Sequence, residues 1–355
     1  MVRTHTARFV THDLASVALV AIGLSLGMSG SASAQGEVNV YSYREPQLID
    51  PLVKAFADKT GIKVNIVYAA AGLNERLAAE GANSPADLLF TVDAGRLSEA
   101  KDAGLTQPVK LTPALEAIPK QLRDPDNHWF GLTMRGRVIY ASKDRVPQDA
   151  ITYEELADPK WKGKICSRSG QHVYNTSLLA TIIAHKGEAA AEAWAKGFKD
   201  NLAQKPAGGD REQVRDVQSG KCDLAIGNTY YMALMMTNEK NPEQKQWAAA
   251  VKLLFPNAND RGTHVNISGA ALTRHAPNKD NAVKLIEFLA SDEAQKIYSQ
   301  QNNEYPVNAH VEPSAIVKGF GTLKPDTLPL ENIAKYRKKA SEIMDKVQFD
   351  AGPSS

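Results

Sequence analysis

The fold is decided by the stretch VNVYSYREPQLIDPLVKAFADKTGIKVNIVY, residues 38–68. Two β-rich runs, Val38–Tyr43 and Lys63–Tyr68, flank an amphipathic helical pattern at Leu48–Thr60. A strand–helix–strand order joins parallel strands, because the helix carries the chain back to the edge of the sheet where the first strand began. The sequence therefore predicts an α/β fold built on a parallel sheet.

The alternation of strand and helix patterns continues along the chain. Further strands are predicted at Asp87–Val92, Arg137–Ser142, Lys164–Ser167, Cys222–Gly227 and Gly269–Thr273. Further helices are predicted at Leu73–Glu80, Leu97–Ala103, Thr176–His185, Gly187–Lys196, Tyr230–Thr237, Asp280–Ala290, Asp292–Gln300 and Leu330–Val347. One more helix is expected to have Asp210 as its cap, with Gln213 in the capping-box position, and to end at Gly220.

The middle of the chain contains no linker rich in Gly, Pro or Ser, which argues against two independently tethered domains. Two αβ lobes joined by more than one crossing strand would place a binding cleft between them, where strand ends and helix starts converge. We expect residues 35–135 and 266–312 to form lobe 1, and residues 136–265 and 313–355 to form lobe 2.

The N-terminus has the pattern of an export signal. Arg3 and Arg8 precede a nearly uncharged stretch, Leu14–Met28, and Ala32-Ser33-Ala34 offers small residues for cleavage before Gln35. A membrane anchor is disfavoured, because about fifteen apolar residues are fewer than the roughly twenty that span a bilayer. We therefore predict a signal peptide at residues 1–34 and a periplasmic protein that diffuses freely, since no cysteine near the cleavage site could carry a lipid.

The composition after removal of this segment is that of a globular protein. About 320 residues remain, enough for two lobes of about 100 to 200 residues each, and the apolar content of 43% supports packed cores. The 42 basic and 40 acidic residues give a net charge of +2, and loss of Arg3, Arg8 and Asp13 leaves +1. A nucleic-acid-binding protein, which would carry a strongly basic face, is therefore not expected.

Two cysteines and their following tyrosines have matching spacings. Cys166 precedes Tyr174 by eight residues, and Cys222 precedes Tyr230-Tyr231 by the same number (174 − 166 and 230 − 222). In an oxidising compartment a disulfide is favoured, although two buried free thiols are the alternative. A disulfide holds its Cα atoms within about 7 Å, so it would place two parallel strands side by side and their tyrosine-bearing ends next to each other.

Three phenol groups gathered at a cleft suit a hard, highly charged cation such as Fe³⁺, which prefers anionic oxygen donors. Phenol titrates near pH 10, so the metal itself would have to displace the proton, and binding would weaken as the pH falls. The alternative is structural, because tyrosines at helix starts often stack in a core with their hydroxyls hydrogen-bonded. From the residues alone, both interpretations of Tyr174, Tyr230 and Tyr231 remain open.

Two arginines stand where an anion could help to complete such a site. Three phenolates would balance the charge of Fe³⁺ without filling six coordination positions, so an anion or water would be needed. Arg44 follows the first predicted strand directly, and Arg135 lies just before the strand Arg137–Ser142. Each arginine alone is more readily explained as a solvated side chain or a salt-bridge partner, and it is the position at strand ends that favours Arg44 and Arg135 as anion ligands.

The chain resembles the periplasmic ferric iron-binding proteins of type II solute-binding fold, in the branch related to bacterial transferrins. The resemblance covers nearly the whole mature chain and is carried by short segments: VYSYR (40–44), WFGLT (129–133), ADPKWKGK (157–164), GGDR (208–211) and CDLAIGNTYY (222–231). The last segment is the specific one, since its paired tyrosines are ferric ligands in that family, and Tyr174 matches the family's third tyrosine.

The resemblance implies a two-lobe carrier with crossing hinge strands that binds Fe³⁺ through Tyr174, Tyr230 and Tyr231 and passes it to an ABC transporter permease. Many relatives have a His, or His-Tyr, after the arginine of the first strand, whereas this chain has Glu45-Pro46. It is therefore similar to members that use three tyrosines and a carbonate-like anion, here held by Arg44 and Arg135. Tyr43 and Glu45 are additional candidates for the cleft. Glu45, whose carboxylate is a hard oxygen donor, is the less favoured alternative as a direct ligand.

Two competing functions remain at this point. A small organic ligand such as a polyamine or thiamine could stack on the same aromatic rings, but a polyamine site should also gather carboxylates. An exported enzyme is disfavoured, because residues 35–355, which follow the predicted signal peptide, contain no G-x-S-x-G elbow and no P-loop. We expect a monomeric carrier without enzymatic activity.

Overall fold

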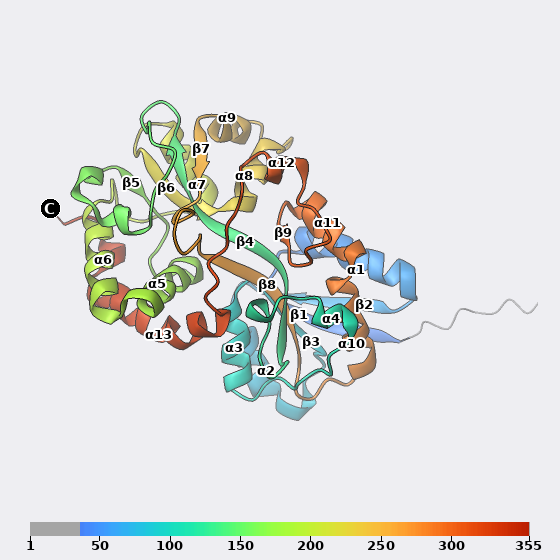
Figure 1. Cartoon of the computed structure of the whole chain (residues 1–355). Helices are drawn as coiled ribbons and strands as arrows, with labels where there is room; N and C mark the ends of the chain where they lie inside the picture. The colour runs from blue at the N-terminus through green and yellow to red at the C-terminus, as the bar shows by residue number, and fades with distance from the viewer. Residues whose placement is uncertain (1–35, 355) are drawn as a thin grey trace, which may run out of the picture. The chain divides into compact units, whose positions relative to one another are not determined.

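One long strand, β4 (Trp129–Ser142), organises the fold in the computed structural model, which describes residues 36–354 (Figure 1). From Trp129 to Gly136 it pairs with β8 (Val265–Leu272), and from Arg137 onward it pairs with β6 (Leu224–Asn228). The sequence predicts a strand only at Arg137–Ser142, so the observed strand is longer by its whole first half. The predicted signal peptide and its cleavage site before Gln35 lie outside the described residues.

The strands form a mixed sheet in the order β2-β1-β3-β8-β4-β6-β5, with β7 and β9 also paired to β4. The β1–β2, β1–β3 and β5–β6 pairs are parallel, as the strand–helix–strand order predicts, whereas β8 and β4 are antiparallel to their neighbours. The remaining strands are β1 (Glu37–Ser42), β2 (Lys63–Tyr68), β3 (Leu88–Thr91), β5 (Ile165–Cys166), β7 (Val251–Leu254) and β9 (Tyr305–Pro306).

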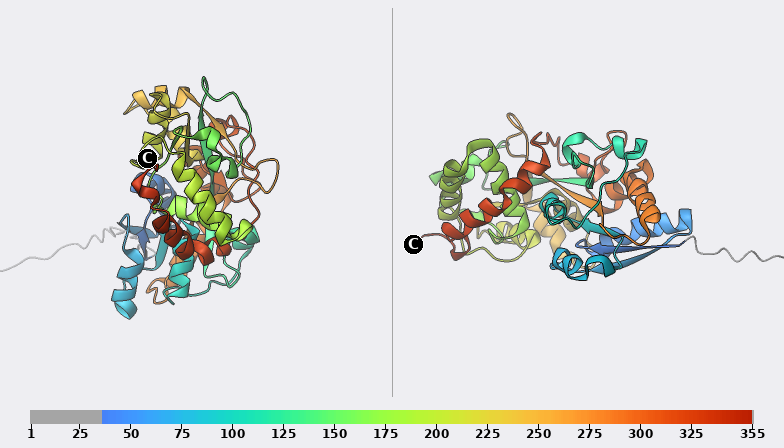
Figure 2. Two further views of the ribbon diagram at one scale, coloured as in Figure 1. Left: turned by 90° about the vertical axis from the view of Figure 1, so that its left-hand side faces the viewer. Right: turned by 90° about the horizontal axis from the view of Figure 1, so that it is seen from below.

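Helices cover the faces of this sheet. They are α1 (Pro46–Thr60), α2 (Leu73–Glu80), α3 (Ala94–Asp102), α4 (Pro113–Glu116), α5 (Val173–Lys186), α6 (Glu188–Asp200), α7 (Asp210–Gln218), α8 (Thr229–Met236), α9 (Glu243–Ala249), α10 (Lys279–Ala290), α11 (Asp292–Asn302), α12 (Ala315–Lys318) and α13 (Leu330–Lys346). The C-terminal helix α13 lies along α5 and also contacts α3 (Figure 2). Within residues 36–354 none of the helices has the length and apolarity that a bilayer crossing requires.

Several predicted helix boundaries are wrong by a few residues because capping decides them. Helix α1 begins at Pro46, two residues before the predicted start, since a proline at the first helical position needs no donor for its missing N–H. Helix α5 begins at Val173, where the ring of His172 accepts a hydrogen bond from the Tyr174 N–H. Neither start shows in the apolar periodicity that the sequence prediction used.

The prediction of Asp210 as a helix cap is also wrong. The cap of α7 is Gly209, whose N–H donates to the Glu212 carboxylate at 2.8 Å, so Glu212 rather than Gln213 reaches back to the cap. Asp210 is the first helical residue, and its side chain is buried against two arginines. The sequence therefore predicts the start of this helix correctly, but Asp210 forms ion pairs instead of capping the helix.

A disulfide joins Cys166 to Cys222, with the Cα atoms 5.8 Å apart. Cys166 lies in β5, whereas Cys222 lies two residues before β6, and both sulfurs are buried in a small apolar cluster. The bond ties the short strand β5 to the segment that leads into its parallel neighbour β6.

Removal of this disulfide should destabilise the protein, because the bond closes a loop across 56 positions and so restricts the unfolded chain. We expect the double substitution Cys166→Ala and Cys222→Ala to lower the free energy of unfolding by about 2–4 kcal/mol, measured by urea denaturation. The oxidised wild type is the reference. An unchanged urea midpoint would show that the disulfide adds no stability.

Candidate functional site

Two helices that carry tyrosines begin side by side at one edge of the sheet. Tyr174 is the second residue of α5, and Tyr230 and Tyr231 are the second and third residues of α8. The hydroxyl oxygens of Tyr174 and Tyr230 are 3.3 Å apart, and the ring centroids of Tyr230 and Tyr231 are 4.2 Å apart. The structure therefore brings the three predicted tyrosines into one cluster.

The cluster forms because β5 and β6 are parallel neighbours, whose carboxyl ends share one edge of the sheet. The equal spacing from the two cysteines is not what aligns the hydroxyls, because Cys166 pairs with Ala225 rather than with Cys222. Helix α8 follows β6 directly, although the predicted strand and helix left Asn228-Thr229 between them, whereas α5 is reached through a loop. The loop before Tyr174 is longer than the connection before Tyr230. Its added length brings the two tyrosines together although the cysteines do not lie opposite each other in the strands.

The tyrosines line a cavity of about 280 Å³ that also collects positive charge. Its charged lining consists of five arginines and two glutamates: Arg44, Arg96, Arg135, Arg168, Arg211, Glu45 and Glu304. Five arginines and two glutamates give these lining residues a net charge of +3 when all are ionised. Such a lining favours an anion, or a cation whose ligands are themselves anionic.

Burial keeps the phenols of the α8 pair protonated in the absence of a cation. Tyr230 is 7% exposed, and burial raises its pKa well above 10, with further contributions from the neighbouring Tyr174 and Tyr231. Burial likewise raises the pKa of Tyr231. A cation that binds these oxygens must therefore displace protons, as bound metals do for other ligands.

Arg135 has hydrogen-bonding capacity left over. It is 2% exposed, its Nη1 lies 3.3 Å from the Ser268 hydroxyl, and its Nε and Nη2 have no hydrogen-bond partner within residues 36–354. Arg135 also forms no salt bridge in this part of the chain. An unpaired buried guanidinium is costly, so a negative group in the cavity would stabilise it.

Arg44, the other predicted anion residue, lies next to Arg135 but is already paired. Its Nη1 and Nη2 donate to Glu304 at 3.1 and 2.5 Å, and Nη1 also donates to Ser268 at 2.5 Å. The Ser268 hydroxyl thus joins Arg44 to Arg135. The charge of Arg44 is balanced by a carboxylate 260 positions away in sequence, which no local pattern reveals.

Three further arginines were not singled out by the sequence reasoning. The guanidinium of Arg168 lies 5.2 Å from the Tyr174 ring, that of Arg211 4.9 Å from the Tyr231 ring, and that of Arg96 4.3 Å from the Tyr43 ring. Such cation–π contacts hold positive charge against the faces of these rings. The sequence could have marked two of these arginines as candidates for the cleft, because Arg168 follows a predicted strand and Arg211 lies in the GGDR segment.

The two additional cleft candidates differ in availability. Tyr43 is buried, and its hydroxyl donates to the Asn74 side chain at 3.2 Å and accepts from the Asn74 N–H at 2.9 Å. Glu45 is exposed and accepts a hydrogen bond from Gln47. Both residues line the cavity, but Glu45 has the freer oxygens.

His172 and the acidic residues do not provide another metal site. Burial, with help from Arg168, lowers the pKa of His172 to about 3, so its ring is neutral and accepts from the Tyr174 N–H at 3.3 Å. Among residues 36–354 no three side chains of His, Cys, Asp or Glu are grouped so that they could hold a metal. A metal in this region would depend on the tyrosines.

Comparisons with known proteins identify the family of this chain. Residues 83–319 match a family model described as "Bacterial extracellular solute-binding protein". The iron uptake protein A1 of Synechocystis sp. is 46% identical over 314 residues, which cover 88% of this chain and 87% of that protein.

Solved structures show the same fold. The crystal structure of the apo ferric ion-binding protein A of Pasteurella haemolytica has 51% sequence identity and a TM-score of 0.84, covering 88% of this chain and 98% of that one. A Trichodesmium protein in complex with iron and citrate ligands has 45% identity and a TM-score of 0.84, covering 88% and 100% of the two chains. The predicted fold, a two-lobe periplasmic-binding-protein type II fold with crossing hinge strands, is confirmed.

The raised pKa of Tyr230 predicts how the iron-free protein titrates. Because burial disfavours the phenolate, Tyr230 should stay protonated while an exposed phenol ionises near pH 10. We expect the tyrosinate absorbance of metal-free wild type and Tyr230→Phe to coincide from pH 7 up to about pH 10. A loss of tyrosinate signal in the variant below that pH would contradict the assigned burial.

Proposed function

Because this chain belongs to the family of bacterial extracellular solute-binding proteins, we propose that it is a carrier that captures ferric iron and delivers it to an ABC importer. The observation that carries the proposal is the meeting of the Tyr174 and Tyr230 hydroxyls in a cavity with Tyr231. Iron uptake and ferric iron binding are the properties named for relatives that cover most of the chain. The protein is a carrier and not an enzyme.

The cellular setting follows from the same premise. The export signal predicted at residues 1–34, with cleavage before Gln35, would place the carrier in the periplasm. Its partner there would be the permease of an ABC importer in the inner membrane, and we propose that the carrier acts as a monomer. No role in nucleic-acid binding is proposed, in keeping with the nearly balanced charge of the chain.

The metal chemistry uses the phenol oxygens of Tyr174, Tyr230 and Tyr231. Fe³⁺ favours hard anionic oxygen donors, and three phenolates balance its charge of +3. Each phenol must release a proton on binding, so the apparent affinity falls as the pH falls. The guanidinium groups of Arg135 and Arg168 lie 5.7 and 5.2 Å from the Tyr174 ring, so positive charge adjoins the place where the metal and its anionic ligands would lie.

An anion would complete the coordination shell of the iron. We propose that carbonate or bicarbonate, or another carboxylate-type anion, binds to Arg135 through the donors that have no protein partner. Arg44 would border the same anion, with its own charge held by Glu304. The citrate in the Trichodesmium complex is an anion of this class.

Capture is proposed to involve closure of two lobes, residues 35–135 with 266–312 and residues 136–265 with 313–355. The pairing of β4 supports this division, because its partner changes from β8 to β6 between Gly136 and Arg137. The tyrosines would belong to lobe 2, and Arg44 to lobe 1. Rotation about strands such as β4 and β8 would bring Arg44 towards iron bound on the tyrosines.

The alternative ligands fit the cavity less well. A polyamine or the cationic thiamine would face five arginines and two glutamates, and one of those glutamates is already engaged by Arg44. Like charges in a cleft oppose binding, even where aromatic rings offer stacking surfaces. The charge of the cavity therefore favours the ferric iron proposal.

Iron loading is the direct test of this function. The mature protein exposed to ferric citrate should bind one iron per chain and become coloured through tyrosinate-to-iron charge transfer. Tyr230→Phe should abolish the colour and lower the affinity more than about 100-fold, since partners of metal ligands alone contribute about 10- to 100-fold. Tyr336→Phe, on α13 and outside the cavity lining, is the control. A colourless wild type would overturn the proposal.

The proposed anion site predicts a specific loss in Arg135→Gln. The variant should require about 10- to 100-fold more iron for half-saturation in bicarbonate buffer, and its affinity should no longer depend on bicarbonate concentration. Arg123→Gln, whose arginine lies outside the cavity lining, should behave as wild type. Full retention of the bicarbonate dependence by Arg135→Gln would place the anion elsewhere.

A further inference from the structure

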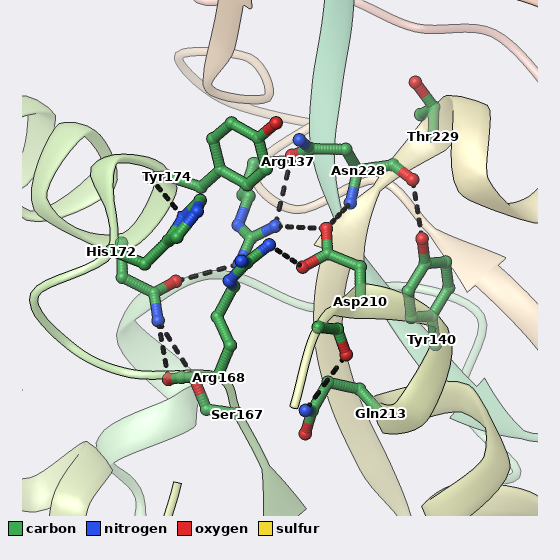
Figure 3. A network of polar contacts seen from close by, with 12 residues as sticks. Arg137, Tyr140, Ser167, Arg168, His172, Tyr174, Asp210, Gln213, Asn228 and Thr229 are labelled. Carbon is green, nitrogen blue, oxygen red and sulfur yellow. Dashed lines mark hydrogen bonds and ion pairs between the residues drawn. The ribbon is translucent and has the colours of Figure 1, made fainter. Parts of the chain in front are cut away.

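A single buried carboxylate lies behind the tyrosine cluster. Asp210 accepts from Arg137 Nη1 at 2.8 Å, from Arg168 Nη1 at 3.1 Å and from the Asn228 N–H at 2.8 Å (Figure 3). Its side chain is fully buried, with 0% exposed. Burial disfavours its charge, but the ion pairs with Arg137 and Arg168 hold the pKa of Asp210 below its ordinary value, so it is ionised at neutral pH.

One side of this network fixes the start of α8. Asn228, two residues before Tyr230, donates its N–H to Asp210, and its side-chain oxygen accepts from Arg137 Nη1 at 3.1 Å. The Asn228 carbonyl accepts from the Tyr140 hydroxyl at 2.5 Å. The Tyr140 ring can lie against β6 only because Gly227 has no side chain, since a Cβ there would be 2.2 Å from the ring.

The other side of the network fixes the start of α5. Arg137 Nη2 donates at 2.9 Å to the side-chain oxygen of Asn175, the residue after Tyr174. The Asn175 amide in turn donates at 3.1 Å to Ser167 and to the carbonyl of Arg168, in the loop between β5 and α5. Arg137 therefore connects the two tyrosine-bearing helix starts, and Asp210 holds Arg137.

We infer that Asp210 is a positioning residue for iron capture: through Arg137, Arg168 and Asn228 it sets the placement of Tyr174 against Tyr230. The placement of the tyrosines is inferred from the contacts of Asp210. The consequence for iron capture rests on the proposed function. Asp210 touches none of the tyrosine oxygens in any contact of residues 36–354. Its effect is exerted through neighbours of the ligands, as second-layer partners do in other metal sites.

Asp210 also limits the positive charge around Tyr174. The guanidinium groups of Arg135, Arg137 and Arg168 lie 5.7, 5.5 and 5.2 Å from the Tyr174 ring. Asp210 offsets one of these three charges. Its loss would therefore change both the position and the electrostatic surroundings of the tyrosine, and both changes can be observed in the charge-transfer band.

The test compares Asp210→Asn with Asp124→Asn in the mature protein. Asp124 is a matched control, because it is 3% exposed, pairs with Lys101 at 2.7 Å and accepts two backbone N–H groups, yet does not line the cavity. We expect Asp210→Asn to weaken ferric iron binding about 10- to 100-fold and to shift the charge-transfer maximum. Asp124→Asn should leave both unchanged, even where it lowers thermal stability.

An iron-free measurement separates this inference from the proposed function. In a crystal structure of metal-free Asp210→Asn, the Tyr174 and Tyr230 hydroxyls should be further apart than the 3.3 Å of the wild type. An unchanged separation would overturn the inference whether or not the protein binds iron. Failure of the wild type alone to bind iron would instead overturn the proposed function.

A second variant covers the case in which Asp210→Asn does not fold. Asn175→Ala removes the link from Arg137 to the start of α5 and leaves both ion pairs of Asp210 in place. It should weaken iron binding and separate the hydroxyls in the same direction. A folded Asn175→Ala with the wild-type affinity, spectrum and hydroxyl distance would overturn the inference.

Discussion

The approach of two phenol oxygens, those of Tyr174 and Tyr230, is the contact on which the proposed site depends. It requires two strand–helix connections to end at the same point, and the parallel pairing of β5 with β6 provides this. Tyr230 does not ionise readily by itself, because burial and the neighbouring Tyr174 both raise its pKa. A multivalent cation removes both obstacles at once.

Positive charge is distributed unevenly around these oxygens. Arg44 is paired with Glu304, and Arg168 shares the Asp210 carboxylate with Arg137, so these ion pairs fix the positions of both cavity arginines. Arg135 has no such partner within residues 36–354, and two of its nitrogens remain without acceptors. Arg96 and Arg211, which also line the cavity without an ion pair in the described residues, are only partly buried, so the proposed anion would stabilise the fully buried Arg135 most.

The buried network behind the tyrosines explains how the residues around the proposed site are held in place. Asp210, Arg137 and Asn175 are each hydrogen-bonded to at least one of the others, and they connect a strand, two helices and a loop. Buried polar groups are tolerated when nearly all of their bonds are made, and a satisfied network specifies one geometry. In the proposed site the group of metal ligands can then be small, because residues that do not touch the metal would set its geometry.

The sequence by itself determined the strand–helix–strand order and the position of Tyr174 and Tyr230 after strand ends, because these depend on local periodicity. It also favoured the pairing of Cys166 with Cys222, because an exported chain with two cysteines offers one disulfide. The tertiary structure decided the rest. It alone showed that β4 is continuous, that Arg44 is paired with Glu304, and that Asp210 is a buried acceptor rather than a helix cap. Such contacts join residues far apart in sequence, and which polar groups meet is fixed only when the sheet brings their elements together.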